Sequence, residues 1–160
     1  MDGAVSNESD GPLPRQNAAA IGSHPIILYD RVCGLCNRFT QFVLRNDAHA
    51  VFRFASLQSA FATHLLERNS SNRRELETVY VVLKPGQTDE LLLSRSDAVI
   101  FVLKYLGGIR RVAGYILAWI PWPLRDWGYR WLARNRYRLF GRLDACPVPS
   151  LEERGRFLDV

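Results

Sequence analysis

The 160-residue sequence is poor in metal-binding and cross-linking side chains, with three cysteines and three histidines. Three cysteines are too few for the disulfide framework of a small secreted protein. A structural zinc site usually takes four Cys or His ligands in two close pairs. Here Cys146 stands alone, and His24, His49 and His64 form no pair with metal-ligand spacing. We therefore expect neither a metal site nor another bound cofactor.

The sequence also lacks an apolar run long enough to span a membrane. The longest run, residues 112–124, has 13 residues and includes two prolines, whereas a spanning helix needs about 20. Residues 1–23 have no basic start or apolar stretch of the kind found in signal peptides, and they carry three acids. We interpret them as a disordered tail and expect a cytoplasmic protein.

Acidic residues are scarce in the C-terminal third. Residues 109–142 contain eight arginines and one acid, Asp126, so this segment carries +7 and the rest of the chain −2. A helix is expected over 124–138, with the arginines on one face and an apolar face made by Leu124, Trp127, Trp131, Leu132 and Leu139. Such a helix suits either a membrane surface or packing on the domain with a solvated arginine face, and we prefer packing. No recognised nucleic-acid-binding module accompanies the charge, so no nucleic-acid partner is expected.

One Cys-x-x-Cys motif, from Cys33 to Cys36, lies between an expected strand and an expected helix. The strand is the apolar run at residues 25–29, and apolar residues at helical spacing follow over 34–46. The unpaired amides and the dipole at a helix N-terminus stabilise a thiolate, which is the reactive form of cysteine. We predict a redox pair in which Cys33 attacks and Cys36 resolves. Half of a metal site and a pair of inert buried cysteines are the alternatives.

The order of expected elements indicates an α/β fold. Further strands are expected at 51–54, 78–83 and 90–93, with a helix after the second strand, begun by Ser56, and one after the fourth, begun by Ser94 and Asp97. A strand, crossover helix and strand give a parallel pair, and a closing hairpin adds antiparallel strands. The result is a thioredoxin-like four-stranded mixed sheet flanked by helices over 24–108, with a basic, Trp-rich helical extension over 109–160.

Two further residues are candidates for the reaction. Asp30 lies three residues before Cys33, where it would either pass a proton to or from Cys36 or cap the amides of the loop. An ionised carboxylate at that distance would oppose a thiolate. Cys146 would either resolve a mixed disulfide with Cys33 or be a thiol without a chemical role.

Asp30-x-x-Cys33-x-x-Cys36 is the signature of the DCC family of predicted thiol–disulfide oxidoreductases, which this chain resembles. The likeness continues in separate blocks at residues 52–59, 94–98, 125–126, 135–141 and 144–149. The resemblance covers nearly everything from residue 25 onward. It implies a thioredoxin-like fold in which Cys33 and Cys36 are the redox pair.

The chain departs from ordinary thioredoxins before its third strand. Those proteins have a cis-proline there that shapes the substrate groove, whereas Thr78 or Val79 takes that place here. Ser94, Ser96 and Asp97 lie where glutaredoxin-like proteins hold glutathione, and a helix cap explains the same residues. Thr78 and these three residues are therefore the candidates for substrate binding.

These features predict a thiol–disulfide oxidoreductase of the protein-disulfide reductase type. Its substrate would be a disulfide of a protein or a small thiol, and an external reductant would restore the Cys33/Cys36 pair. The alternative is a non-catalytic thioredoxin-like binding module. Such a module would dock on a membrane surface or a protein through its Arg/Trp helix.

Overall fold

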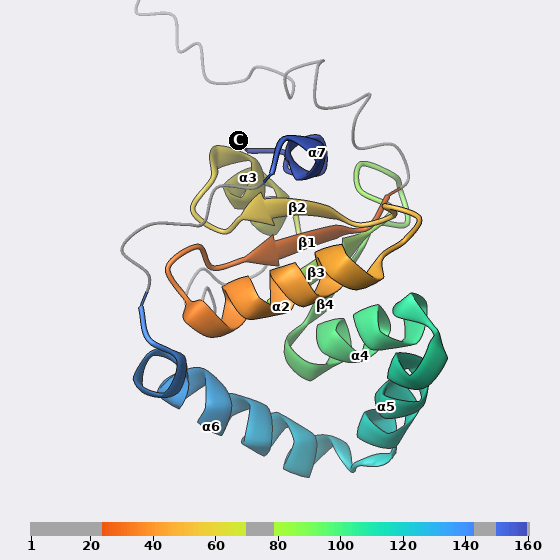
Figure 1. Ribbon diagram of the computed structural model, residues 1–160, viewed down its shortest axis with the longest axis vertical. Coiled ribbons are helices and arrows are strands. Elements are labelled where there is room, and N and C mark those ends of the chain that lie inside the picture. The colour runs from red at the N-terminus through yellow and green to blue at the C-terminus, as the bar shows by residue number, and fades with distance from the viewer. Residues whose placement is uncertain (1–23, 70–78, 143–149, 160) are drawn as a thin grey trace, which may run out of the picture.

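A computed structural model describes residues 24–69, 79–142 and 150–159. At its centre is a sheet in the order β2-β1-β3-β4, formed by β1 (Ile26–Tyr29), β2 (Arg53–Ser56), β3 (Tyr80–Leu83) and β4 (Leu91–Ser94). β1 pairs parallel with β2 and antiparallel with β3, and β3 pairs antiparallel with β4 (Figure 1). The predicted thioredoxin-like mixed sheet is confirmed. The expected tail, Thr78 and Cys146 lie outside the described residues.

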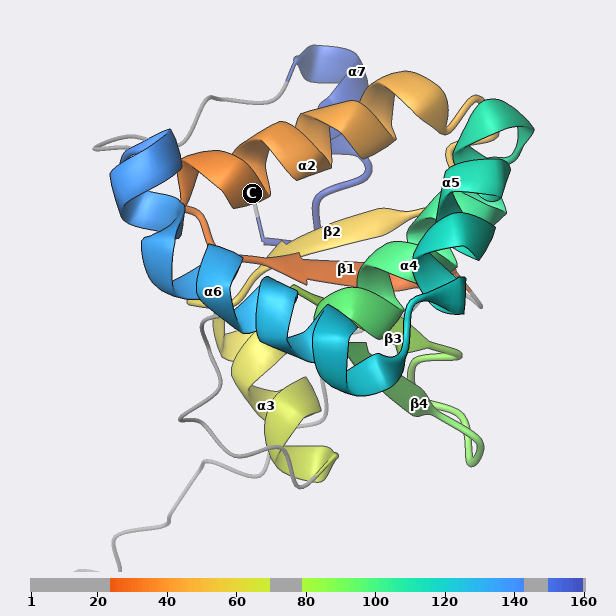
Figure 2. The same cartoon turned by 90° about the horizontal axis from the view of Figure 1, so that it is seen from below.

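Helices cover both faces of this sheet. α2 (Gly34–Asn46) and α4 (Arg95–Leu106) lie on one face and α3 (Ala60–Arg68) on the other (Figure 2). Side chains alternate along β1. Ile27 and Tyr29 therefore pack in the same core as the two cysteines, and Ile26 and Leu28 pack in the core beneath α3. Because both faces are covered, β1 is an apolar run without polar alternation.

Of the two predicted serine caps, Ser56 was wrong, whereas Ser94 is the N-cap residue of α4 but makes no capping bond. Ser56 lies in β2, and α3 is capped by Ser59, whose hydroxyl accepts a hydrogen bond of 3.1 Å from the Ala62 amide. The chain enters α4 through Arg95 at a φ of 53°, which is not the backbone geometry of an ordinary helix start.

Three more helices follow: α5 (Gly108–Trp119), α6 (Trp122–Phe140) and α7 (Leu151–Arg154). α5 packs against α4, and α6 crosses both α2 and α4. After α7 the chain runs beside β2, where the Leu158 amide donates to the Phe54 carbonyl at 2.9 Å. This last segment covers the outer edge of the sheet and was not anticipated from the sequence. No helix in the described part of the chain is long and apolar enough to span a bilayer.

The face that α6 turns towards the domain was predicted wrongly. Trp127 and Trp131 were expected to pack inward, but they are 66% and 54% exposed. The buried residues of α6 are Asp126 and Arg136 instead. Asp126 pairs with Arg95 of α4, and Arg136 pairs with Asp30 in the loop after β1. The most deeply buried contacts of this helix are therefore ion pairs.

Candidate active site

Cys33 and Cys36 lie at the junction of β1 and α2. Cys33 is the N-cap residue of α2, and its Sγ accepts a hydrogen bond from the Cys36 amide at 3.3 Å. The loop before it is closed by the Cys33 amide, which donates to the Asp30 carbonyl at 3.3 Å. Both thiols are free in this structure. The strand and the helix therefore direct an amide donor at the first sulfur, as the spacing predicts.

The two thiols have opposite pKa shifts. The hydrogen bond from the Cys36 thiol lowers the pKa of Cys33 from 9.0 to about 6; burial opposes this, and the Cys36 amide and the charge of Arg136 add to it. The same hydrogen bond raises the pKa of Cys36, as do burial and the charge of the Cys33 thiolate. At neutral pH the pair thus holds a thiolate on Cys33 and a proton on Cys36.

We expect the alkylation rate of Cys33 to rise with pH around a midpoint near pH 6. The thiolate is the form that reacts, and its population grows as the pH passes the pKa. Cys36→Ala removes the thiol donor and should move the midpoint upward, whereas Cys36→Ser keeps a donor and should move it less. The measurement is the rate of iodoacetamide labelling against pH, with the site identified by peptide mass. A wild-type midpoint near 8.5, typical of a free thiol, would contradict the assignment.

Asp30 is buried and accepts four hydrogen bonds. Its Oδ1 binds the Val32 amide at 3.1 Å and Gln58 Nε2 at 2.9 Å. Its Oδ2 binds the Tyr137 hydroxyl at 2.7 Å and the Arg136 guanidinium at 3.1 Å. The Val32 contact is the loop capping considered above. Because both oxygens are occupied by donors, this geometry favours capping and ion pairing over proton transfer.

The sequence patterns did not indicate Arg136, Tyr137 or Gln58 as site residues. Arg136 is 3% exposed, and its charge lowers the pKa of both cysteines. A signal was present, because these residues fall within the blocks 135–141 and 52–59 that resemble the DCC family. The charge pattern alone did not show which of the eight arginines would be buried.

The end of α6 covers Cys33. The Gly34 amide donates to the Gly141 carbonyl at 3.3 Å, and Cys33 forms an isolated β-bridge with Arg142. Cys33 is consequently 0% exposed and Cys36 4% exposed. The Cys33 side chain is therefore closed off from solvent in this structure, with Gly141 and Arg142 in contact with the backbone beside it.

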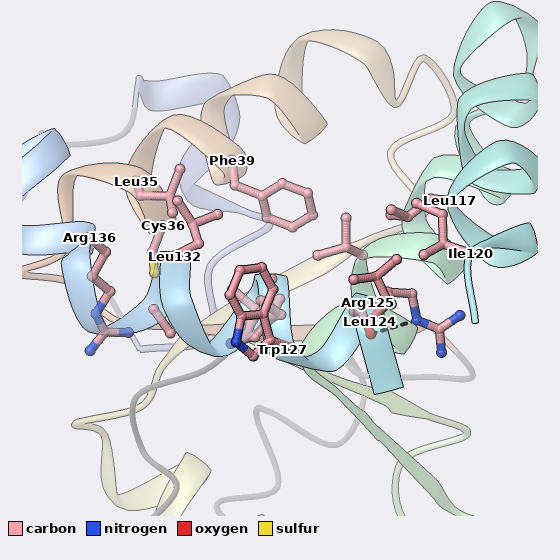
Figure 3. A pocket seen from close by; sticks show the side chains of 16 residues that line it. Leu35, Cys36, Phe39, Leu117, Ile120, Leu124, Arg125, Trp127, Leu132 and Arg136 are labelled. Atoms are coloured by element: carbon pink, nitrogen blue, oxygen red, sulfur yellow. Dashed lines mark hydrogen bonds between the residues drawn. The ribbon is translucent and has the colours of Figure 1, made fainter. Parts of the chain in front are cut away.

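Cys36 lines a largely apolar cavity of about 550 Å³ between α2, α4, α5 and α6. Figure 3 shows Cys36 and Arg136 at one end and Arg125 at the other. Arg125 donates to the Ser96 hydroxyl at 2.9 Å and also pairs with Asp97. Of the described candidates for substrate binding, Ser96 lines this cavity and Ser94 and Asp97 do not.

A comparison with protein-family models matches a part of the chain that contains Cys33, Cys36 and Arg136. The family model for DCC1-like thiol-disulfide oxidoreductases matches residues 27–142. The chain belongs to this family. The family is one of thiol–disulfide oxidoreductases, so redox chemistry is assigned at the level of the family. The resemblance to the DCC family that the sequence showed is confirmed. Within the described residues of this DCC1-like protein, no three His, Cys, Asp or Glu side chains are grouped to hold a metal ion.

Two relatives are each 34% identical to this DCC1-like protein over their aligned residues. The uncharacterized protein YuxK of Bacillus subtilis (strain 168) is 34% identical over 133 residues, 83% of this chain and 93% of that protein. The DCC family protein At1g52590, chloroplastic, of Arabidopsis thaliana is 34% identical over 124 residues, 78% of this chain and 69% of that protein. No solved structure matches the chain.

Proposed function

We propose that this protein reduces disulfides by thiol–disulfide exchange, with Cys33 as the attacking sulfur and Cys36 as the resolving one. The observation that carries the proposal is the division of charge between the two thiols. Cys33 has its pKa lowered to about 6, while Cys36, whose amide binds the Cys33 sulfur, keeps its proton. Membership of a thiol–disulfide oxidoreductase family supports the same class of reaction.

The first step is attack by the Cys33 thiolate on one sulfur of a substrate disulfide. A bond forms between Cys33 and that sulfur, the substrate S–S bond breaks, and the second substrate sulfur leaves as a thiolate. The protein and the substrate are then joined by a mixed disulfide. Arg136 lowers the pKa of Cys33 and so favours the attacking form.

The second step is attack by Cys36 on the Cys33 sulfur of that mixed disulfide. Once Cys33 is bonded to the substrate, it no longer accepts the hydrogen bond or carries the charge that raise the pKa of Cys36. The pKa of Cys36 therefore falls, helped by Arg136, and its proton passes to the departing substrate thiolate. The protein ends as a Cys33–Cys36 disulfide and the substrate as two thiols, the first of which takes its proton from solvent. An external dithiol, as in a reducing cytoplasm, returns the protein to its starting state.

The substitution Gly34→Ala tests whether residues 140–142 cover Cys33. A Cβ at Gly34 would overlap the carbonyl oxygen of Phe140, so the covering segment would have to shift. We expect a stability loss of about 1–3 kcal/mol, typical of overpacking, despite alanine's better helix propensity. Alkylation of Cys33 should become faster because its cover is displaced. The measurements are denaturant unfolding and the labelling rate at one pH.

The control for this substitution is Gly128→Ala on α6. A Cβ at Gly128 meets no atom within 4 Å, so this variant should gain up to about 1 kcal/mol from helix propensity alone. Its Cys33 labelling rate should stay at the wild-type value. If Gly34→Ala left both stability and labelling unchanged, residues 140–142 would not be the cover of Cys33.

The proposed function is tested by oxidising the wild-type protein and locating its disulfide. We expect a Cys33–Cys36 bridge with Cys146 left as a thiol, a two-electron equilibrium with dithiothreitol, and reduction of insulin by the reduced protein. Peptide mapping and the equilibrium titration give the bridge and its reduction potential. Absence of the bridge and of insulin reduction would overturn the proposal and favour a non-catalytic binding module. A Cys33–Cys146 bridge would instead make Cys146 the resolving thiol.

A further inference from the structure

The turn between α5 and α6 exposes large apolar side chains that the domain does not cover. Trp119 is 92% exposed, and Ile116, Trp122, Leu124 and Trp127 are each more than half exposed. Ile116 and Trp119 belong to α5 and the other three to α6, and these five residues are called here the tryptophan corner. Figure 1 shows the turn that joins the two helices. Large apolar side chains exposed close together in the sequence are a candidate binding surface.

Polar contacts, not tryptophans, attach α6 to the domain. These contacts include the ion pairs of Asp126 with Arg95 and Arg136 with Asp30, and the bond from the Val79 amide to the Tyr129 hydroxyl. The position of α6 therefore does not depend on burying its tryptophans. Their side chains are available to another surface.

The helices of the corner carry positive charge and no exposed carboxylate. Asp126 is the one acid among the residues of α5 and α6, and it is 2% exposed and paired with Arg95 and Arg130. Arg134 and Arg138 are exposed on α6. The two helices that carry the corner are thus complementary to a negatively charged partner.

We propose that the tryptophan corner binds the surface of an anionic lipid bilayer. Tryptophan side chains are suited to the headgroup boundary, and arginines bind anionic headgroups. Trp119 projects from the protein instead of lining a groove, which suits a fluid surface better than a shaped pocket. A second copy of this chain is disfavoured, because two segments of +7 would face each other.

Docking at this corner also affects the cavity that reaches Cys36. Leu124 and Trp127 belong to the corner and also line that cavity, so a docked bilayer would contact two residues of its lining. If the proposed function holds, the substrate disulfide would be carried by a membrane-associated molecule. The docking itself does not depend on the redox chemistry.

The test is binding of the full chain to vesicles of phosphatidylglycerol and phosphatidylcholine, compared with phosphatidylcholine alone. We expect co-sedimentation with the anionic vesicles only, weakened by added salt. Tryptophan emission should shift to shorter wavelength on binding. All four tryptophans lie within residues 119–131, so emission reports on α5 and α6 alone. The variant Cys33→Ser should bind as the wild type does, which separates this proposal from the redox one.

The variant Trp119→Ser/Trp122→Ser should bind anionic vesicles at least about tenfold more weakly. The control is Leu91→Ser on β4, which alters a side chain that is 53% exposed but far along the chain from the corner, and it should bind normally. Circular dichroism verifies that both variants fold. The proposal is overturned if the wild type does not sediment with anionic vesicles, if the tryptophan variant binds equally well, or if the corner instead forms a dimer in sedimentation equilibrium.

Discussion

Cys33→Ser is expected to lower insulin reduction to the rate that dithiothreitol supports without protein. The serine hydroxyl is not ionised at neutral pH, so the attacking thiolate and the mixed disulfide are both lost. Cys33 is also the thiol whose pKa is about 6, so no other described side chain replaces its chemistry. The measurement is the onset of insulin precipitation at fixed dithiothreitol, with circular dichroism to verify the fold.

The companion variant Cys36→Ser separates attack from resolution. It keeps Cys33 and should form a mixed disulfide with the substrate that persists, because the resolving sulfur is gone. This species is detected as added mass on the peptide that contains Cys33. Cys146→Ser serves as the control and should retain reduction of insulin. Full activity in Cys33→Ser, or a mixed disulfide on Cys36 in the wild type, would contradict the assigned order of attack.

The core of the fold was predictable because local signals and topology agree. The apolar run at residues 26–29, the helix that begins at Gly34 and the hairpin of β3 and β4 each have a short-range pattern. Together these patterns allow few arrangements of four strands. The N-cap of α3 was less predictable, because Ser56 and Ser59 are similar candidates and only the length of β2 decides between them.

The surroundings of the cysteines were only partly predictable. The motif located Cys33, Cys36 and Asp30, but Arg136 lies more than a hundred residues away on a helix with many other arginines. A helical wheel assumes that the apolar side faces the core. In α6 the assumption fails, because a buried carboxylate on the loop after β1 requires a cation and the helix supplies one. Long-range charge pairing leaves no local pattern in the sequence.

Arg136→Met should destabilise the protein by about 3–5 kcal/mol, because it leaves the Asp30 carboxylate buried without its cation. The two side chains are 4% and 5% exposed, so solvent screens the pair little. Asp30→Asn should lose a similar amount of stability, because it leaves the Arg136 guanidinium buried without its carboxylate. The double variant Asp30→Asn/Arg136→Met should lose less than the sum of the single variants, because no unpaired charge remains. Denaturant unfolding of the four proteins gives the coupling energy.

A second readout distinguishes a purely structural pair from one that also acts on the thiols. Arg136→Met should raise the pKa of Cys33, since the charge of Arg136 lowers it, and the alkylation midpoint should move above pH 6. The control is Arg156→Met, which breaks the half-buried pair of Arg156 with Asp47. Arg156 is not among the groups that shift the pKa of Cys33, so this variant should lose stability and keep the midpoint. If the two variants had the same alkylation midpoint, Arg136 would hold α6 on the domain without acting on the Cys33 thiol.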